Sequence, residues 1–169
     1  WQCASGTGGM TLFDSGLVVA VGDEVSVTGT VGAFGDEIQL ENTTVTVLSS
    51  GNFSLPTPIA TGDLAAGTDM LGSLMTVQGM LSKTSADGCF NCQYAIDDGS
   101  GPVIVFVDGT TGITEADLDS WTGDIVKIQG ATKCYNGEGE ILPRYTTDIC
   151  LIAIPNGESG WGALKAQFK

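Results

Sequence analysis

The sequence predicts an all-β protein, and two observations support that prediction. First, stretches of good helix formers are scarce, whereas the 25 glycines and the abundant threonine, valine and isoleucine favour short strands joined by turns. Second, the strand-like segment Gly123–Gly130 has a near copy close to the N-terminus, Gly22–Gly29. Apolar and polar side chains alternate in both, as in a strand with one buried face. The chain therefore contains an internal repeat.

The repeat extends on both sides of these strands. Downstream, Ile38–Leu48 aligns with Ile141–Leu151, and upstream, Ser5–Phe13 aligns with Asp98–Phe106. The alignment places Trp1 opposite Tyr94 and finds nothing in the first copy to match Leu74–Leu81. The first copy is therefore expected to lack one strand that the second copy has.

The elements follow in order. The first copy predicts strands at 5–13, 22–29 and 38–48, and Pro56 and Pro58 then mark a connector because proline cannot donate to a strand ladder. Thr114 with Asp117 three residues later predicts the start of a short helix ending near Trp121. The second copy predicts strands at 74–81, 93–97, 103–107, 123–130 and 141–151. The expected regions are 1–50, a connector 51–73, 74–152, and a tail 153–169.

Three strands, a short helix and two more strands are typical of the OB fold, a small Greek-key barrel. The residues agree, in the run Tyr94–Phe106, then Gly123–Val126, then Ile141–Arg144 with Asp148 and Ile149. This part of the chain resembles the OB-type modules of secreted bacterial and archaeal proteins, which often stand beside extracellular nucleases. The resemblance implies two OB-like barrels in tandem, the first without its own first strand. It implies no catalytic role, since the nuclease chemistry belongs to a separate domain.

A barrel without its first strand leaves open edges, which are a template for pairing with another strand. The predicted acceptor groove is lined by Trp1, Cys3, Val25 and Val27. The tail is the predicted donor, because its apolar residues alternate as a strand requires. The expected anchors are Trp161, Leu164, Ala166 and Phe168.

Charge distinguishes the tail from the rest of the chain. Residues 1–152 carry four Lys and Arg against nineteen Asp and Glu, a net charge of −15, whereas residues 153–169 carry two Lys against one Glu, a net charge of +1. The tail could fill the groove of its own molecule or that of the next, and the second route builds a filament unless it closes a ring. A third alternative is that residues upstream of Trp1 supply the strand.

The five cysteines favour structural disulfides in an oxidising compartment. Cys89 and Cys92 form a C-x-x-C, a weak zinc signal without a second pair or any histidine. Of three possible pairings in the second copy, we expect Cys89 with Cys92 and Cys134 with Cys150, which leaves Cys3 free, buried or paired with another chain.

No catalytic group of residues is evident. The chain has no histidine, so Ser–His and Cys–His pairs are excluded, and its paired acids sit where turns or a helix cap explain them. We expect no metal site and no cofactor, although calcium bound in a carboxylate-rich turn stays an alternative. Asn42 and Asn52 begin N-glycosylation patterns.

The net charge of −14 argues against nucleic acid as a partner, because phosphate binding draws on Lys and Arg. No apolar run is long enough to span a membrane. If a ligand face exists, its candidates are Tyr94, Tyr135 and Tyr145, although core packing is the more common role of such aromatics. Two functions compete: an extracellular or cell-surface structural protein whose partners are copies of itself, and an OB-type module that binds nucleic acid or glycan beside a secreted enzyme.

Overall fold

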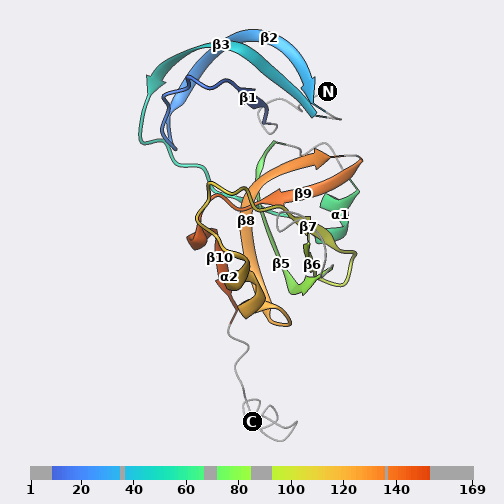
Figure 1. Ribbon diagram of the computed structural model, residues 1–169. Helices are drawn as coiled ribbons and strands as arrows, with labels where there is room; N and C mark the ends of the chain where they lie inside the picture. Colours follow the sequence, from blue (N-terminus) through green and yellow to red (C-terminus); the bar gives the residue numbers. More distant parts are fainter. Residues whose placement is uncertain (1–8, 35–36, 67–71, 85–92, 136, 153–169) are drawn as a thin grey trace, which may run out of the picture.

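A computed structural model describes residues 9–34, 37–66, 72–84, 93–135 and 137–152. Its central unit is a closed five-stranded barrel (Figure 1). The order around the barrel is β5-β6-β7-β9-β8, and β8 pairs with β5 to close it. The strands are β5 (Leu74–Lys83), β6 (Tyr94–Asp97), β7 (Val103–Val105), β8 (Ile125–Tyr135) and β9 (Glu138–Leu142). This is the strand order of the OB fold, so the sequence prediction for this region is confirmed.

The short helix between β7 and β8 is also confirmed. Helix α2 (Glu115–Trp121) begins at Thr114, whose hydroxyl accepts a hydrogen bond from the Asp117 amide, while the Asp117 carboxylate accepts one from the Thr114 amide. This reciprocal capping box stabilises the first turn of the helix. Leu118 then points into the barrel and is fully buried.

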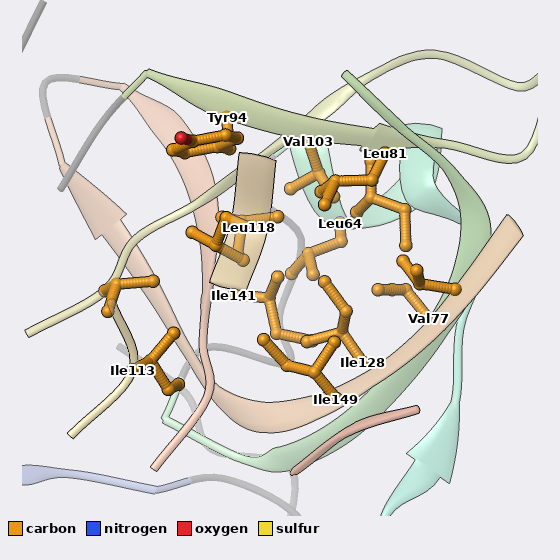
Figure 2. Packing of buried hydrophobic residues seen from close by; sticks show 14 residues of the cluster. Leu64, Val77, Leu81, Tyr94, Val103, Ile113, Leu118, Ile128, Ile141 and Ile149 are labelled. Atoms are coloured by element: carbon orange, nitrogen blue, oxygen red, sulfur yellow. The ribbon is translucent and has the colours of Figure 1, made fainter. Parts of the chain in front are cut away.

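The connector after the first copy contributes to the barrel. Strand β4 (Thr57–Pro58) pairs in parallel with β5, and α1 (Thr61–Ala65) follows it. Leu64 of α1 is 1% exposed and belongs to the same buried cluster as Leu118. Figure 2 shows the side chains of Leu64, Leu118 and Ile141 converging in the interior of the barrel. Residues from two distant segments therefore fill the core together with the strands.

The N-terminal part forms a separate three-stranded sheet, which we name the N-terminal sheet. It consists of β1 (Thr11–Phe13), β2 (Glu24–Phe34) and β3 (Glu37–Ser49), in the order β1-β3-β2 (Figure 1). Strand β1 is parallel to β3 and β2 is antiparallel to it. Over the residues described, this sheet is open, and the predicted tandem of two barrels is not confirmed.

The N-terminal sheet nevertheless repeats part of the barrel strand for strand. In the N-terminal sheet, residues 30–34 of β2 pair with residues 41–37 of β3. In the barrel, residues 131–135 of β8 pair with residues 142–138 of β9. The two registers are the same, since each barrel residue number is 101 higher than its counterpart. The pairing of β1 with β3 likewise repeats that of β7 with β9: Leu12 lies opposite Leu40, and Val105 opposite Ile141. The internal repeat is therefore present in the strand pairing.

The structure corrects one alignment. The sequence aligned Ile38 with Ile141, but the strand register places Leu40 at the position of Ile141. A shift of two residues keeps the same face of a strand, so alternation alone cannot detect it. Beyond a bulge near Asn42 (φ 49°), Val45 pairs with Val27 as Ile149 pairs with Ile128.

The two copies also differ in length at this bulge. In the second copy, the 3-10 helix η2 (Thr146–Asp148) separates β9 from β10 (Ile149–Leu151), whereas β3 runs through the corresponding region as one strand. The second copy is therefore three residues longer at this place. An alignment without gaps cannot match the strands on both sides of the bulge, so the sequence alignment agreed with neither register.

Candidate functional site

The candidate site is the inner face of the N-terminal sheet, which the register defines by comparison with the barrel. In the barrel, the side chains at five core positions are between 0% and 5% exposed: Val105, Val126, Ile128, Ile141 and Ile149. Their counterparts in the N-terminal sheet are only half-buried: Leu12, Val25, Val27, Leu40 and Val45. Apolar positions that form a core in one copy therefore remain in contact with solvent in the other.

Further apolar side chains of the N-terminal sheet are exposed outright. Val31 is 68% exposed, whereas its counterpart Thr132 is 3% exposed. Phe13 and Phe34 are 68% and 59% exposed. These exposures show that the N-terminal sheet carries apolar side chains in contact with solvent.

The edges of the N-terminal sheet are open in the described part of the chain. In the barrel, β8 pairs with β9 on one side and with β5 on the other. Its counterpart β2 pairs with β3 alone among the described residues, so the edge that corresponds to the β5 side carries unpaired backbone groups. An apolar face beside an open edge can accept a further strand.

The predicted acceptor and donor residues stand as follows. Val25 and Val27 lie half-buried on the inner face, and their role as acceptor residues stays a prediction. Trp1 and Cys3, and the donor residues Trp161, Leu164, Ala166 and Phe168, lie outside the described residues. Sequence reasoning missed Leu12, Leu40 and Val45, although their alternation with polar neighbours was readable once the register was known.

A cleft of about 500 Å³ lies between the N-terminal sheet and the barrel. Its lining includes Phe53 and Leu55, which are 85% and 72% exposed, together with Asp23, Gln129 and Arg144. The guanidinium of Arg144 donates hydrogen bonds to both carboxylate oxygens of Asp148, over 2.9 and 3.1 Å. The cation beside the cleft is therefore paired within the protein.

Asp148 forms a buried polar centre beside this cleft. Its carboxylate also accepts hydrogen bonds from the Arg144 amide at 2.9 Å and from the Gln129 side chain at 2.7 Å. Burial raises the pKa of Asp148, but the hydrogen bonds from Arg144 and Gln129 outweigh it and leave this pKa below its usual value. This arrangement fixes η2 and β10 to β8.

The three tyrosines do not form one ligand face. Tyr94, a candidate only if a ligand face exists, is completely buried in the core, and its hydroxyl donates to Asp119 over 2.6 Å. Burial and the Asp119 carboxylate raise the pKa of Tyr94 to about 12. Tyr135, 39% exposed, stacks on Phe34 with ring centroids 6.4 Å apart. Tyr145, 47% exposed, lies on another element, beside Arg144.

Asp119 belongs to a small ionic cluster that fastens α2 to the barrel. The Lys83 ammonium lies 2.9 Å from Asp119 and 3.0 Å from Glu115, and these hydrogen bonds raise the pKa of Lys83. Hydrogen bonds from Lys83 and Gln93 lower the pKa of Glu115, and those from Tyr94 and Lys83 lower the pKa of Asp119. One ammonium pairs with two carboxylates here, and all three groups are engaged within the fold, so the cluster has a structural role.

The expected pairing of Cys134 with Cys150 is not formed. Both thiols are free, and the register explains why. Cys150 lies opposite Lys127, whereas Cys134 lies seven residues further along β8, about 23 Å away in an extended strand. A disulfide requires Cα atoms within about 7 Å. Cys89 and Cys92 lie outside the described residues.

The neighbouring acids Asp97 and Asp98 behave as turn residues. The Asp97 carboxylate accepts hydrogen bonds from the amides of Gly99 and Gly101, and Asp98 accepts from Thr61 and Ser100, which lowers the pKa of Asp98. Among the described residues, no three His, Cys, Asp or Glu side chains gather as metal ligands. The described helices are also too short to cross a membrane.

The two glycosylation candidates differ in their surroundings. The side-chain amide nitrogen of Asn52 donates to the Gly22 carbonyl and to the Ser49 hydroxyl, each over 2.9 Å. Asn42 is exposed at the bulge of β3. The amide and the hydroxyl of the neighbouring Thr43 donate hydrogen bonds to the Asp14 carboxylate, over 2.9 and 3.1 Å.

Comparison with known proteins finds only distant structural likeness. No protein-family model and no curated protein matches the chain. Among solved structures, the OBody AM1L10 bound to hen egg-white lysozyme is similar at 18% identity, a TM-score of 0.42, 59% of this chain and 96% of that chain. The hypothetical protein ygiW from E. coli is similar at 21% identity, a TM-score of 0.39, 61% of this chain and 100% of that chain. Such distant likeness carries no argument about function.

Proposed function

We propose that the protein is a non-catalytic structural subunit of an extracellular filament or matrix, assembled head to tail by donation of a strand. One observation supports this proposal above the others. On the inner face of the N-terminal sheet, the counterparts of five barrel-core residues are only half-buried. Burying this face under one more strand adds backbone hydrogen bonds and removes apolar area from water at once.

The tail supplies a strand of suitable chemistry. Leu164, Ala166 and Phe168 alternate with Lys165 and Gln167, so one face of an extended tail is apolar and the other polar. Its net charge of +1 complements the net charge of −15 on residues 1–152. The first, incomplete barrel is then completed only in the assembly.

The test is electron microscopy and sedimentation of the whole chain beside a variant shortened after Ala153. We expect filaments from the whole chain and none from the shortened one, whose N-terminal sheet should also aggregate because its apolar face stays open. A matched pair of full-length variants isolates the strand: Leu164→Asn with Phe168→Asn should prevent assembly, and Lys165→Asn with Gln167→Asn should allow it. A shortened protein that remains a stable monomer, with an intact chain that never polymerises, would refute the proposal.

A binding module is the alternative, and one observation favours it. The Lys133 ammonium lies 5.4 Å from the ring centroids of both Phe106 and Tyr135, so aromatic and cationic groups meet on the outside of β7 and β8. Such a group could stack a sugar or a base. Calorimetric titration with soluble glycans and with single-stranded oligonucleotides tests this alternative. Lost affinity in Tyr135→Ala, with the fold retained, would support it.

A further inference from the structure

Two asparagines in the N-terminal part of the chain begin the pattern Asn-x-Ser/Thr, the acceptor sequence for N-linked glycans. They stand in Asn42-Thr43-Thr44 and Asn52-Phe53-Ser54. Both asparagines are exposed, so exposure alone does not distinguish them. Because the sugar is attached to the side-chain nitrogen, the hydrogen bonds of the two amide groups decide which site the folded protein offers.

The side-chain nitrogen of Asn52 is engaged in the fold. It donates hydrogen bonds to the Gly22 carbonyl and to the Ser49 hydroxyl, each over 2.9 Å, and that hydroxyl donates to Glu24 over 2.7 Å. The backbone amide of Asn52 bonds the same Gly22 carbonyl over 2.8 Å. These contacts join the end of β3 to the start of β2. A sugar would replace one of the two N–H groups of this nitrogen, so at least one of its hydrogen bonds would be lost.

Asn42 has different surroundings. Residues 42 and 43 of β3 together oppose the single residue Gly29 of β2, which is a β-bulge, and Asn42 has a φ of 49° there. The two hydrogen bonds from Thr43 to the Asp14 carboxylate hold this bulge in place. Within the described part of the chain, the side-chain amide of Asn42 makes no hydrogen bond. Both of its N–H groups are therefore available, and replacing one disturbs no contact.

The acceptor pattern at Asn42 leaves the inner face of the N-terminal sheet open. Val45 is half-buried on that face, and successive residues of a strand point to opposite faces, so Thr44 lies on the outer face. An enzyme that recognises the Thr44 hydroxyl approaches the outer face. In the proposed assembly, the donated strand covers the inner face, so modification and assembly are compatible.

We infer that Asn42 is a site of N-linked glycosylation in the folded protein and that Asn52 is not. In the transfer, the Asn42 Nδ2 atom forms a bond to the anomeric carbon of a sugar carried by a polyprenyl phosphate. The bond from that carbon to the phosphate oxygen breaks, and the phosphate leaves with the electron pair. The amide nitrogen loses one proton to a base of the transferring enzyme. This assignment holds whether or not the chain forms filaments.

Transfer to the purified whole chain tests the assignment, with a synthetic peptide of residues 38–58 as the unfolded reference. Each is incubated with a lipid-linked oligosaccharide and an oligosaccharyltransferase that recognises Asn-x-Ser/Thr. Chymotrypsin cuts after Leu48, between the two asparagines, so mass spectrometry assigns the added mass to one or the other. We expect both asparagines of the peptide to be modified. In the folded chain, Asn42 should be modified at least about tenfold more than Asn52, whose hydrogen bonds must first break.

Two variants of the whole chain form a matched pair. Thr44→Ala removes the required hydroxyl and should abolish transfer to Asn42, whereas Thr46→Ala, also exposed on β3, keeps the pattern and should retain it. Equal transfer to both asparagines of the folded chain, or transfer to Asn52 alone, would overturn the assignment. A folded chain left unmodified at Asn42 while the peptide is modified there would overturn it as well. A peptide modified at neither asparagine would show that these patterns are not acceptors, with the same result.

Discussion

Two tyrosines illustrate how burial decides the role of a side chain. Tyr94 lies in the interior with its hydroxyl bonded to Asp119, whereas Tyr145 lies on the surface beside Arg144. Each tyrosine stands in a short stretch where polar and apolar residues mix, so the local sequence does not distinguish the two. Only the closure of the barrel around Tyr94 distinguishes them, and closure depends on residues far away in the chain.

This difference gives a stability prediction. Tyr94→Ala should lower the free energy of unfolding by about 3–5 kcal/mol, because it empties a large buried volume. Tyr94→Phe should lower it by about 1 kcal/mol, the usual contribution of one hydrogen bond. Tyr145→Ala should change it by less than about 0.5 kcal/mol. Urea denaturation of the three variants measures these values, and equal losses at Tyr94 and Tyr145 would contradict the assigned burial.

Asp148 predicts how stability depends on pH. Its pKa is lowered in the folded protein, so ionised Asp148 stabilises the fold above the pKa of an unfolded aspartate, about 3.9. That contribution is lost as the pH falls from about 4 through the lower folded-state pKa. Asp148→Asn should therefore flatten the stability profile in this acidic range. At neutral pH it should cost about 1.5–3 kcal/mol, as expected for hydrogen bonds to a charged group.

Denaturation curves between neutral and strongly acidic pH provide the measurement. Asp124→Asn serves as the control, because Asp124 is exposed and leaves the Arg144 contact intact. An acid profile of Asp148→Asn that coincides with the profile of the unmodified protein would show that Asp148 does not have this role.

Among the elements, α1 is one that the sequence did not reveal. Residues 61–65 lie in the proline-containing connector, they are too few for a clear helical period, and Ala60 offers no side-chain cap. The helix exists because Leu64 enters the barrel and because Asp98 accepts a hydrogen bond of 2.8 Å from the Thr61 hydroxyl. Tertiary contacts stabilise it, so local pattern could not predict it.

Leu55 and Leu64 of the connector have opposite expected sensitivities. Leu64→Ala should destabilise the barrel by about 2–5 kcal/mol, since it removes a buried side chain from the core. Leu55→Ala should change stability by less than about 0.5 kcal/mol, because this leucine is exposed at the cleft. Thermal or urea unfolding of the two variants checks the pair. If neither substitution changed the free energy of unfolding, α1 would not pack on the barrel.

The succession of strands along the chain and helix α2 were predictable from the sequence, because their signals are local. Alternation identified the strands, and Thr114 with Asp117 marked the helix start. The register of the first copy was not predictable, because a two-residue shift preserves every inward and outward assignment. Only backbone pairing, such as Leu12 opposite Leu40, resolves it.

For the whole molecule, the charge makes a prediction about nucleic acid. The net charge of −14 should prevent binding to duplex DNA at physiological salt, although OB folds in other proteins bind nucleic acid. Of the few cations, Lys83 and Arg144 are paired with carboxylates, so little positive charge remains for phosphates. A fluorescence titration should show no saturation. Micromolar affinity that weakens steeply with salt would contradict this prediction.

The pairing of β10 with β8 has a mechanical consequence. Strand β10 is the last described element before the tail, and it runs antiparallel to β8, with Ile149 to Leu151 opposite Ile128 to Val126 (Figure 1). Hydrogen bonds of an antiparallel pair stand perpendicular to the strands. A pull on the tail along β10 would therefore shear all these bonds together instead of peeling them one by one. In the proposed assembly, a load on the tail would reach the barrel through these bonds, which would resist it together.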